Sequence, residues 1–177
     1  MKTYSLHTTP PPIIYGFHHT PFGECLVAIT SGKVCYLAFL LGGNRARARR
    51  EMEEVWPGAL YKEEEKTTKS FVQRIFSVTG SGVLRVPVLM QGTPFQVRVW
   101  KELQNIPRGT TVDYKTLAER VGSPRAFRAV GTACGKNHIA VVVPCHRVVA
   151  SDGSLGGYRW GVNRKKALLE WEKPKNK

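Results

Sequence analysis

A run of five apolar residues at 139–143 leads directly into Pro144, Cys145 and His146, and this junction constrains the fold more than any other part of the chain. A short, continuous apolar run predicts a buried strand or an extended core segment. Neighbouring side chains on a strand point to opposite faces, so contact between the thiol and the imidazole would need a turn or a bridging water. Two interpretations remain open: a cysteine nucleophile assisted by a nearby base, or a core cysteine beside a structural histidine.

The composition is that of a strongly basic chain. Its 177 residues suit one domain or two small ones, and of the formal net charge of +14, +10 falls in residues 93–177. A basic half indicates a polyanionic partner, most simply nucleic acid; the alternative is a basic surface that only aids solubility. There is no run of 18 apolar residues and no apolar stretch typical of a secretory signal, so we expect no membrane partner. The spacing of the four cysteines matches neither a disulfide framework nor a Cys-x-x-Cys metal motif, which favours a reducing compartment.

The first half of the chain predicts a small α/β domain over residues 13–90, preceded by a loose tail at residues 1–12. Alternating apolar segments bounded by turn residues predict an antiparallel meander. The strands are expected at residues 13–17, 24–29 and 34–40, the helices at 45–55 and 67–78, and a further strand at 83–88.

The second half, residues 93–173, predicts a mostly helical domain followed by a tail at 174–177. Thr93 and Gln96 form a capping box for the first helix. Asp113 can cap a second helix that ends at Gly122, and a third is expected at residues 125–136. Two helices joined by a short glycine-containing turn are typical of a DNA-binding helix-turn-helix, although an ordinary helical hairpin with a solvated basic face fits the same pattern.

The two faces of the helix at 125–136 differ in character. One face is mostly apolar and comprises Ala126, Val130, Ala133 and Cys134. The other face is polar and comprises Arg125, Arg128, Thr132 and Lys136. The small residues Ala129 and Gly131 permit close approach to a partner. Such a helix could enter a DNA groove with Arg128 as its probe.

Together these motifs resemble the O6-alkylguanine-DNA alkyltransferases, also called methylated-DNA–protein-cysteine methyltransferases. The resemblance covers residues 93–172 and rests on the segments 123–131, 144–149 and 156–161 and on Asn137. Residues 13–90 resemble, through weaker motifs, the small ribonuclease-H-like domain of that family. The implied fold is therefore an α/β domain of that type plus a mostly helical, winged-helix-like C-terminal domain. We expect no additional N-terminal phosphotriester-repair domain.

The resemblance implies direct-reversal DNA repair. An alkyl group would move irreversibly from O6 of guanine, and we expect also from O4 of thymine, to Cys145, after the helix-turn-helix enters the minor groove and the nucleotide is extruded. The implied catalytic residues are Cys145, His146, Glu172, Tyr114 and Asn137. The implied DNA contacts are Arg128, Tyr114, Arg125, Ala126, Ala129, Gly131 and Thr132. The implied base pocket comprises Val148, Ser151, Tyr158, Arg159 and Trp160.

The roles follow from the same resemblance. Glu172 would orient His146, which acts on Cys145 through a water, and Asn137 would tie the recognition helix to the active-site turn. Tyr114 would protonate the leaving guanine at N3 and help to rotate the phosphate, while Arg128 would fill the vacated stack. No cofactor or metal is implied. We expect a monomer that binds alkylated double-stranded DNA, cytoplasmic in a bacterium or archaeon and nuclear in a eukaryote.

Glu172 also stands out without the resemblance. It shares a helical face with Leu168 and Leu169, and a carboxylate on an apolar stripe needs a partner. The alternative is an ion pair at the rim of the protein with one of the lysines at 165, 166 and 173.

Some residues depart from the family pattern, and other functions compete with alkyl transfer. Ala140 and Trp160 stand where vertebrate relatives have proline and a small residue, and the bulk of the tryptophan predicts a pocket that accepts methyl better than benzyl. The vertebrate zinc pattern is matched only by a weak set: Cys25, His7, His18 and His19. The competing functions are a lesion-sensing module, which would lack the nucleophile, a Cys-His hydrolase that turns over, and a transcription factor. Irreversible loss of one thiol per lesion separates alkyl transfer from all three.

Overall fold

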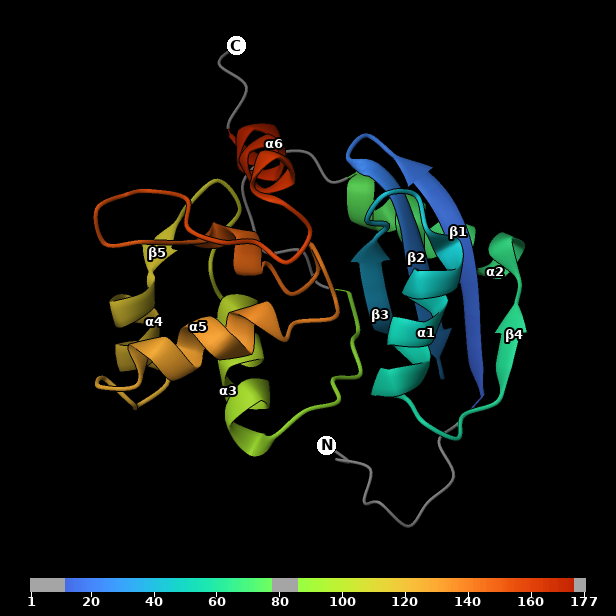
Figure 1. Cartoon of the computed structure of the whole chain (residues 1–177), viewed down its shortest axis with the longest axis horizontal. Helices are drawn as coiled ribbons and strands as arrows, with labels where there is room; N and C mark the ends of the chain where they lie inside the picture. The colour runs from blue at the N-terminus through green and yellow to red at the C-terminus, as the bar shows by residue number, and fades with distance from the viewer. Residues whose placement is uncertain (1–11, 78–85, 174–177) are drawn as a thin grey trace. The chain divides into compact units, whose positions relative to one another are not determined.

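The computed structural model describes residues 12–77 and 86–173, which form two compact units (Figure 1). The N-terminal unit contains residues 12–77 and 86–91, and the C-terminal unit contains residues 92–173. The predicted tails, apart from Pro12, lie outside the described residues. Within the described part of the chain, no helix is long and apolar enough to cross a membrane.

The N-terminal unit is built on a four-stranded sheet with the order β3-β2-β1-β4. The strands β1 (Ile13–Thr20), β2 (Gly23–Thr30) and β3 (Lys33–Phe39) form the predicted antiparallel meander. The sequence prediction missed β4 (Tyr61–Glu63), which is only three residues long and pairs parallel to β1.

The strand expected at 83–88 is not found where it can be examined. Residues 83–85 lie outside the described residues, and Val88 forms only an isolated parallel bridge with Val34. The segment shares only the backbone hydrogen bonds from Val34 N–H to Pro87 O and from Leu89 N–H to Val34 O among the described residues, and these form a single bridge and not a strand.

Two helices cover opposite faces of the sheet (Figure 1). From α1 (Arg45–Val55), Arg45 lies 4.8 Å above the ring of Phe17. The next residue along β1, His18, faces the other way and meets Thr68 of α2 (Glu65–Phe76), with 2.7 Å between Nε2 and Oγ1. Helix α2 approaches so closely that a Cβ on Gly16 would lie 2.5 Å from Thr68 Oγ1. The prediction for α1 is confirmed, whereas α2 begins two residues earlier than expected and Val78 lies outside the described residues.

The C-terminal unit is mostly helical, as predicted. Its elements are α3 (Pro94–Leu103), β5 (Val112–Asp113), α4 (Tyr114–Arg120), α5 (Phe127–Gly135), a 3-10 helix (Cys145–Arg147), β6 (Val148–Val149) and α6 (Val162–Glu172). The capping box of Thr93 and Gln96 is present, and Asp113 caps α4 by accepting the backbone N–H groups of Lys115 and Thr116.

The helix-turn-helix consists of α4 and α5, which both pack against α3. Trp100 of α3 is buried and donates its indole N–H to the carbonyl oxygen of Ala133, at 2.8 Å. Helix α5 begins two residues later than expected, because Ala126 N–H bonds to Ser123 O and closes a tight turn there. Arg125 and Ala126 therefore precede the recognition helix instead of forming its first turn.

Candidate active site

The segment at 139–143 is buried but is not a strand. Val141 has a φ of +65°, a left-handed conformation that is unusual for a β-branched residue. Asn137 supports this turn from within, since its side chain donates to Val143 O at 2.8 Å and accepts from Ile139 N–H at 2.9 Å. The prediction of an extended segment is therefore wrong, because a continuous apolar run reports burial and not backbone conformation.

Cys145 begins the 3-10 helix that follows this turn, and only 5% of it is exposed. Its sulfur accepts a hydrogen bond from Asn137 Nδ2 at 3.2 Å. Burial raises the pKa of the thiol to about 11, although the bond from Asn137 and the charge of Lys165 act in the opposite direction. A thiol with such a pKa needs a base before it can act as a nucleophile.

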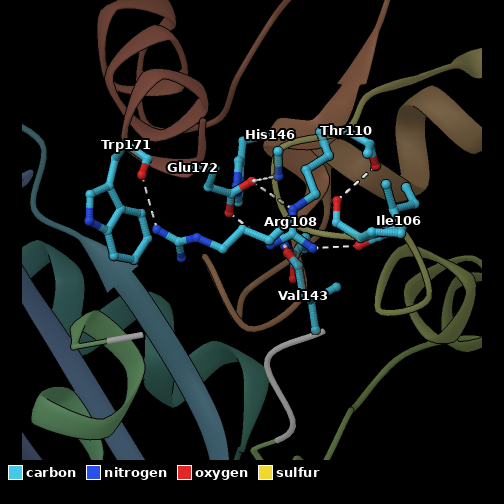
Figure 2. Close-up of polar contacts among 11 residues, drawn as sticks. Ile106, Arg108, Thr110, Val143, His146, Trp171 and Glu172 are labelled. Carbon is cyan, nitrogen blue, oxygen red and sulfur yellow. Dashed lines mark hydrogen bonds and ion pairs between the residues drawn. The ribbon is translucent and has the colours of Figure 1, made fainter. Parts of the chain in front are cut away.

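His146 and Glu172 form a fully buried pair (Figure 2), with 2.9 Å between Nε2 and Oε1. Burial alone would raise the pKa of Glu172, but hydrogen bonds from His146 and Arg147 outweigh that effect and lower it to about 2. Burial lowers the pKa of His146, with Glu172 opposing the shift. The pair at neutral pH is therefore a carboxylate and a neutral imidazole.

This protonation state fixes the tautomer of His146. A carboxylate can only accept, so Nε2 must carry the proton. Nδ1 then holds a lone pair, and this atom has no hydrogen-bond partner among the described residues. The imidazole is thus arranged to accept a proton at Nδ1 while Glu172 holds its other nitrogen.

Arg147 is a third member of this buried cluster, because it bonds to the carboxylate of Glu172. The sequence did not predict it as a site residue. Its guanidinium donates two hydrogen bonds to the carboxylate of Glu172, from Nε to Oε2 at 2.8 Å and from Nη2 to Oε1 at 2.7 Å. It also donates to Ile106 O at 2.5 Å. Such a two-point contact restricts the orientation of the carboxylate more than a single bond could.

Lys165 is a second buried cation near the site. It is completely buried, and its ammonium donates to the carbonyl oxygens of Val148, Leu155 and Gly157. It does not pair with Glu172, and Lys173 pairs with Glu170 instead. The alternative of an ion pair between Glu172 and a lysine at the rim is therefore wrong for Lys165 and Lys173. Lys166 is exposed, whereas the carboxylate of Glu172 is buried and bonds to His146 and Arg147.

A cavity of about 230 Å³ opens beside the sulfur of Cys145. Its walls come from α4, α5, the 3-10 helix and the loop before α6, through Tyr114, Gly131, Cys134, Gly135, Cys145, Gly157, Tyr158 and Arg159. Of the five predicted pocket residues, Tyr158 and Arg159 line this cavity. Val148 is buried, Ser151 is exposed, and Trp160 lies behind the wall with its ring 5.3 Å from that of Tyr158.

The predicted DNA-contacting residues lie where α5 begins and along its outer face. Arg125, Arg128, Ala129 and Thr132 are exposed, whereas Ala126 and Gly131 are half-buried. Gly131 stands beside Tyr114, since a Cβ there would lie 3.7 Å from the phenol ring. Within the described part of the chain, no group of three or more His, Cys, Asp or Glu residues could hold a metal ion, and His7 lies outside it.

Comparison with known proteins places this arrangement in a family. Residues 94–174 match the family described as 6-O-methylguanine DNA methyltransferase, DNA binding domain. The crystal structure of O6-methylguanine methyltransferase from Mycobacterium tuberculosis is 34% identical and has a TM-score of 0.73, covering 91% of this chain and 93% of that one. The chain belongs to the O6-methylguanine DNA methyltransferase family. The predicted family and fold class are thereby confirmed.

Two further relatives extend the comparison. The bifunctional transcriptional activator/DNA repair enzyme Ada of Escherichia coli is 40% identical over 163 residues, which are 89% of this chain and 45% of Ada. The chain spans about half the length of this and other curated relatives that it matches. The M. tuberculosis protein OGT in complex with DNA is 33% identical with a TM-score of 0.71, covering 91% of this chain and 95% of that one.

Sequence reasoning about this chain missed Arg147 and Lys165, although a signal existed for the lysine. Lys165 lies three and seven positions before Leu168 and Glu172, on the same helical face, so its burial could have been anticipated.

Proposed function

We propose that this chain repairs alkylated DNA by moving an alkyl group from O6 of guanine to the sulfur of Cys145. The observation that carries the proposal is the buried thiol on a cavity wall, followed in the chain by a neutral imidazole that a carboxylate holds. The family membership supports this chemistry, and O4 of thymine is a second expected position from which the alkyl group is removed.

The reaction begins with the proton of the thiol. His146 accepts it at Nδ1, directly or through one water, and the resulting charge on the imidazole is stabilised by Glu172. The thiolate then attacks the alkyl carbon, so that the S–C bond forms as the O6–C bond breaks. The electron pair passes to guanine, which takes up a proton at N3 from the hydroxyl of Tyr114. Cys145 ends as a thioether, which has no route back to the thiol, so each molecule acts once.

The base must leave the duplex before the sulfur can reach it. We infer that α5 enters the minor groove and that Arg128 fills the vacated stack, at a cost of about a few kcal/mol for unstacking. The exposed Arg125 and Thr132, together with Ala126, would contact the DNA, and the small residues Ala129 and Gly131 would allow close approach. The structure of the M. tuberculosis relative with DNA supports DNA as the partner.

The extruded guanine would occupy the cavity next to Cys145. Tyr158 and Arg159 would form its wall, and Val148 and Ser151 would offer backbone groups to the base. Asn137 would hold the turn that presents the sulfur. In this proposal residues 93–173 carry DNA binding and catalysis, residues 13–90 form the ribonuclease-H-like domain, and the protein acts as a monomer.

Intact-protein mass spectrometry tests the proposal directly. The protein is incubated with a duplex containing one O6-methylguanine, and a single gain of about 14 Da is expected, because one methyl replaces one hydrogen. Cys145→Ala should show no gain, whereas Cys134→Ala, which removes another thiol on the same cavity, should still be methylated. DNA binding without a gain in mass would instead indicate a lesion-sensing module, and repeated turnover would indicate a hydrolase.

A further inference from the structure

Glu172 lies at the end of a helix, although its side chain is buried. It is the last residue of α6. The last turn of a helix leaves carbonyl groups without intrahelical partners and frays more readily than the middle. A carboxylate that must hold an imidazole therefore sits where the backbone is least restrained by its own helix.

Arg108 meets this last turn from the loop after α3. Its guanidinium lies 3.7 Å from the centre of the Trp171 ring, stacked on its face, and Nη2 donates to Trp171 O at 3.1 Å (Figure 2). The residue is only 6% exposed. It thus supplies a donor to a carbonyl of the last turn, a cation near the negative end of the helix, and a contact with an aromatic face.

The same loop also reaches the carboxylate itself. The backbone N–H of Gly109 lies 3.5 Å from Glu172 Oε2, on the oxygen that accepts from Arg147 Nε. Arg108 does not bond to the carboxylate. Apart from the attraction between its charge and that of Glu172, its contact with the site passes through the end of α6.

We propose that Arg108 is a positioning residue that clamps the end of α6 through Trp171 and so holds Glu172 against His146. This inference rests on the proposed function and deepens it. Without the clamp the last turn opens more often, and in each opening His146 loses the partner that fixes its tautomer.

A double-mutant cycle separates this role from general stabilisation. Single-turnover methyl transfer is measured for Arg108→Ala, Glu172→Gln and the double variant at a temperature at which circular dichroism shows all of them folded. We expect Arg108→Ala to slow transfer about 10-fold in the wild-type background and less than about 2-fold in the Glu172→Gln background. Arg108→Lys should recover part of the rate, because lysine can donate to Trp171 O but cannot stack as a planar group.

The pH profile gives a second readout. Loss of Glu172 lowers the basicity of His146, so Arg108→Ala should move the acid limb of the rate profile to lower pH, as Glu172→Gln does. Arg98→Ala is the matched control, since Arg98 is exposed and lies over the ring of Phe95 at 5.6 Å, in the same unit. It should leave the rate and the acid limb unchanged.

Equal slowing by Arg108→Ala in both backgrounds, with an unmoved acid limb, would overturn the proposal. The reactivity of Cys145 toward iodoacetamide, followed against pH, gives the same comparison without DNA. It therefore tests the clamp even if the wild-type protein transfers no methyl group, an outcome that would count against the proposed function alone.

Discussion

His146 Nε2 lies 2.9 Å from Glu172 Oε1, although 26 positions separate the two residues in the chain. Arg147, next to His146, grips the same carboxylate. The cation and the carboxylate balance each other while the imidazole is neutral, so a proton arriving at His146 adds a net positive charge to a buried group. The arrangement suits a base that holds a proton briefly, and it makes the pair sensitive to the loss of any one member.

Removal of the guanidinium should be costly. Arg147→Met would leave the carboxylate of Glu172 buried, with His146 and Gly109 as its remaining hydrogen-bond partners among the described residues. We expect the free energy of unfolding to fall by about 3–5 kcal/mol. Urea denaturation measures it. Arg147→Lys should recover only part, because an ammonium cannot form the two-point grip.

The partly exposed pair of Arg120 and Glu102, 3.9 Å apart, provides the control. Arg120→Met should cost less than about 1 kcal/mol. A similar small loss for Arg147→Met would show that the buried grip stabilises the protein no more than a surface ion pair does.

Stability should fall steeply in acid. The pKa of Glu172 is lowered from 4.5 to about 2 in the folded protein, so its contribution is fully present above pH 4.5 and is lost as the pH falls toward 2. The size of the effect is on the order of 3 kcal/mol. The pKa of His146 is also lowered, so below its ordinary value the unfolded chain binds a proton that the folded protein does not, which removes stability from about pH 6.5 downward.

A pH series of chemical denaturation for the wild type and Glu172→Gln checks the carboxylate component. The wild type should be the more stable at pH 6, and the difference should shrink toward pH 3. A difference that does not change with pH would show that the carboxylate contributes through packing alone.

Trp160 should restrict the range of alkyl groups. It is 2% exposed and packs on Tyr158, so it stiffens the wall of the cavity without lining it. We expect a duplex containing O6-benzylguanine to react at least about 10-fold more slowly than one containing O6-methylguanine, because a well-packed wall does not yield to extra volume without strain. Trp160→Phe should narrow that ratio while keeping an aromatic contact; comparable wild-type rates for both substrates would contradict the prediction.

The sequence predicted those parts of the molecule that depend on local patterns. Four features follow from spacing and side-chain chemistry, and all are present: the capping box at Thr93, the cap at Asp113, the antiparallel meander, and the position of Glu172 on the buried face of its helix. The roles assigned to the site residues stay predictions.

Features that depend on tertiary contacts could not be predicted in the same way. The turn at Val141 exists because Asn137 satisfies its backbone groups from within, and the apolar run itself carries no sign of this. Arg147 looks like a surface cation until Glu172 is known to lie beside it. The contact of Arg108 with Trp171 joins residues 63 positions apart, for which spacing offers no rule.

Methylation of Cys145 should destabilise the protein to a modest extent. The cavity of about 230 Å³ beside the sulfur has room for one methyl, so severe crowding is not expected. The sulfur, however, accepts from Asn137 Nδ2 at 3.2 Å, and a methyl group on the sulfur competes for space with that donor. We expect a loss of about 1 kcal/mol, which corresponds to a fall in Tm of about 2–4 °C for a chain of this size. Differential scanning calorimetry before and after stoichiometric methylation measures the shift, with protein incubated with an unmodified duplex as the control.

The variant Asn137→Ala tests the cause of the shift. Its donor to the sulfur is absent, so methylation should change Tm by less than in the wild type. An unchanged Tm in the wild type would show that the bond to sulfur contributes nothing to stability.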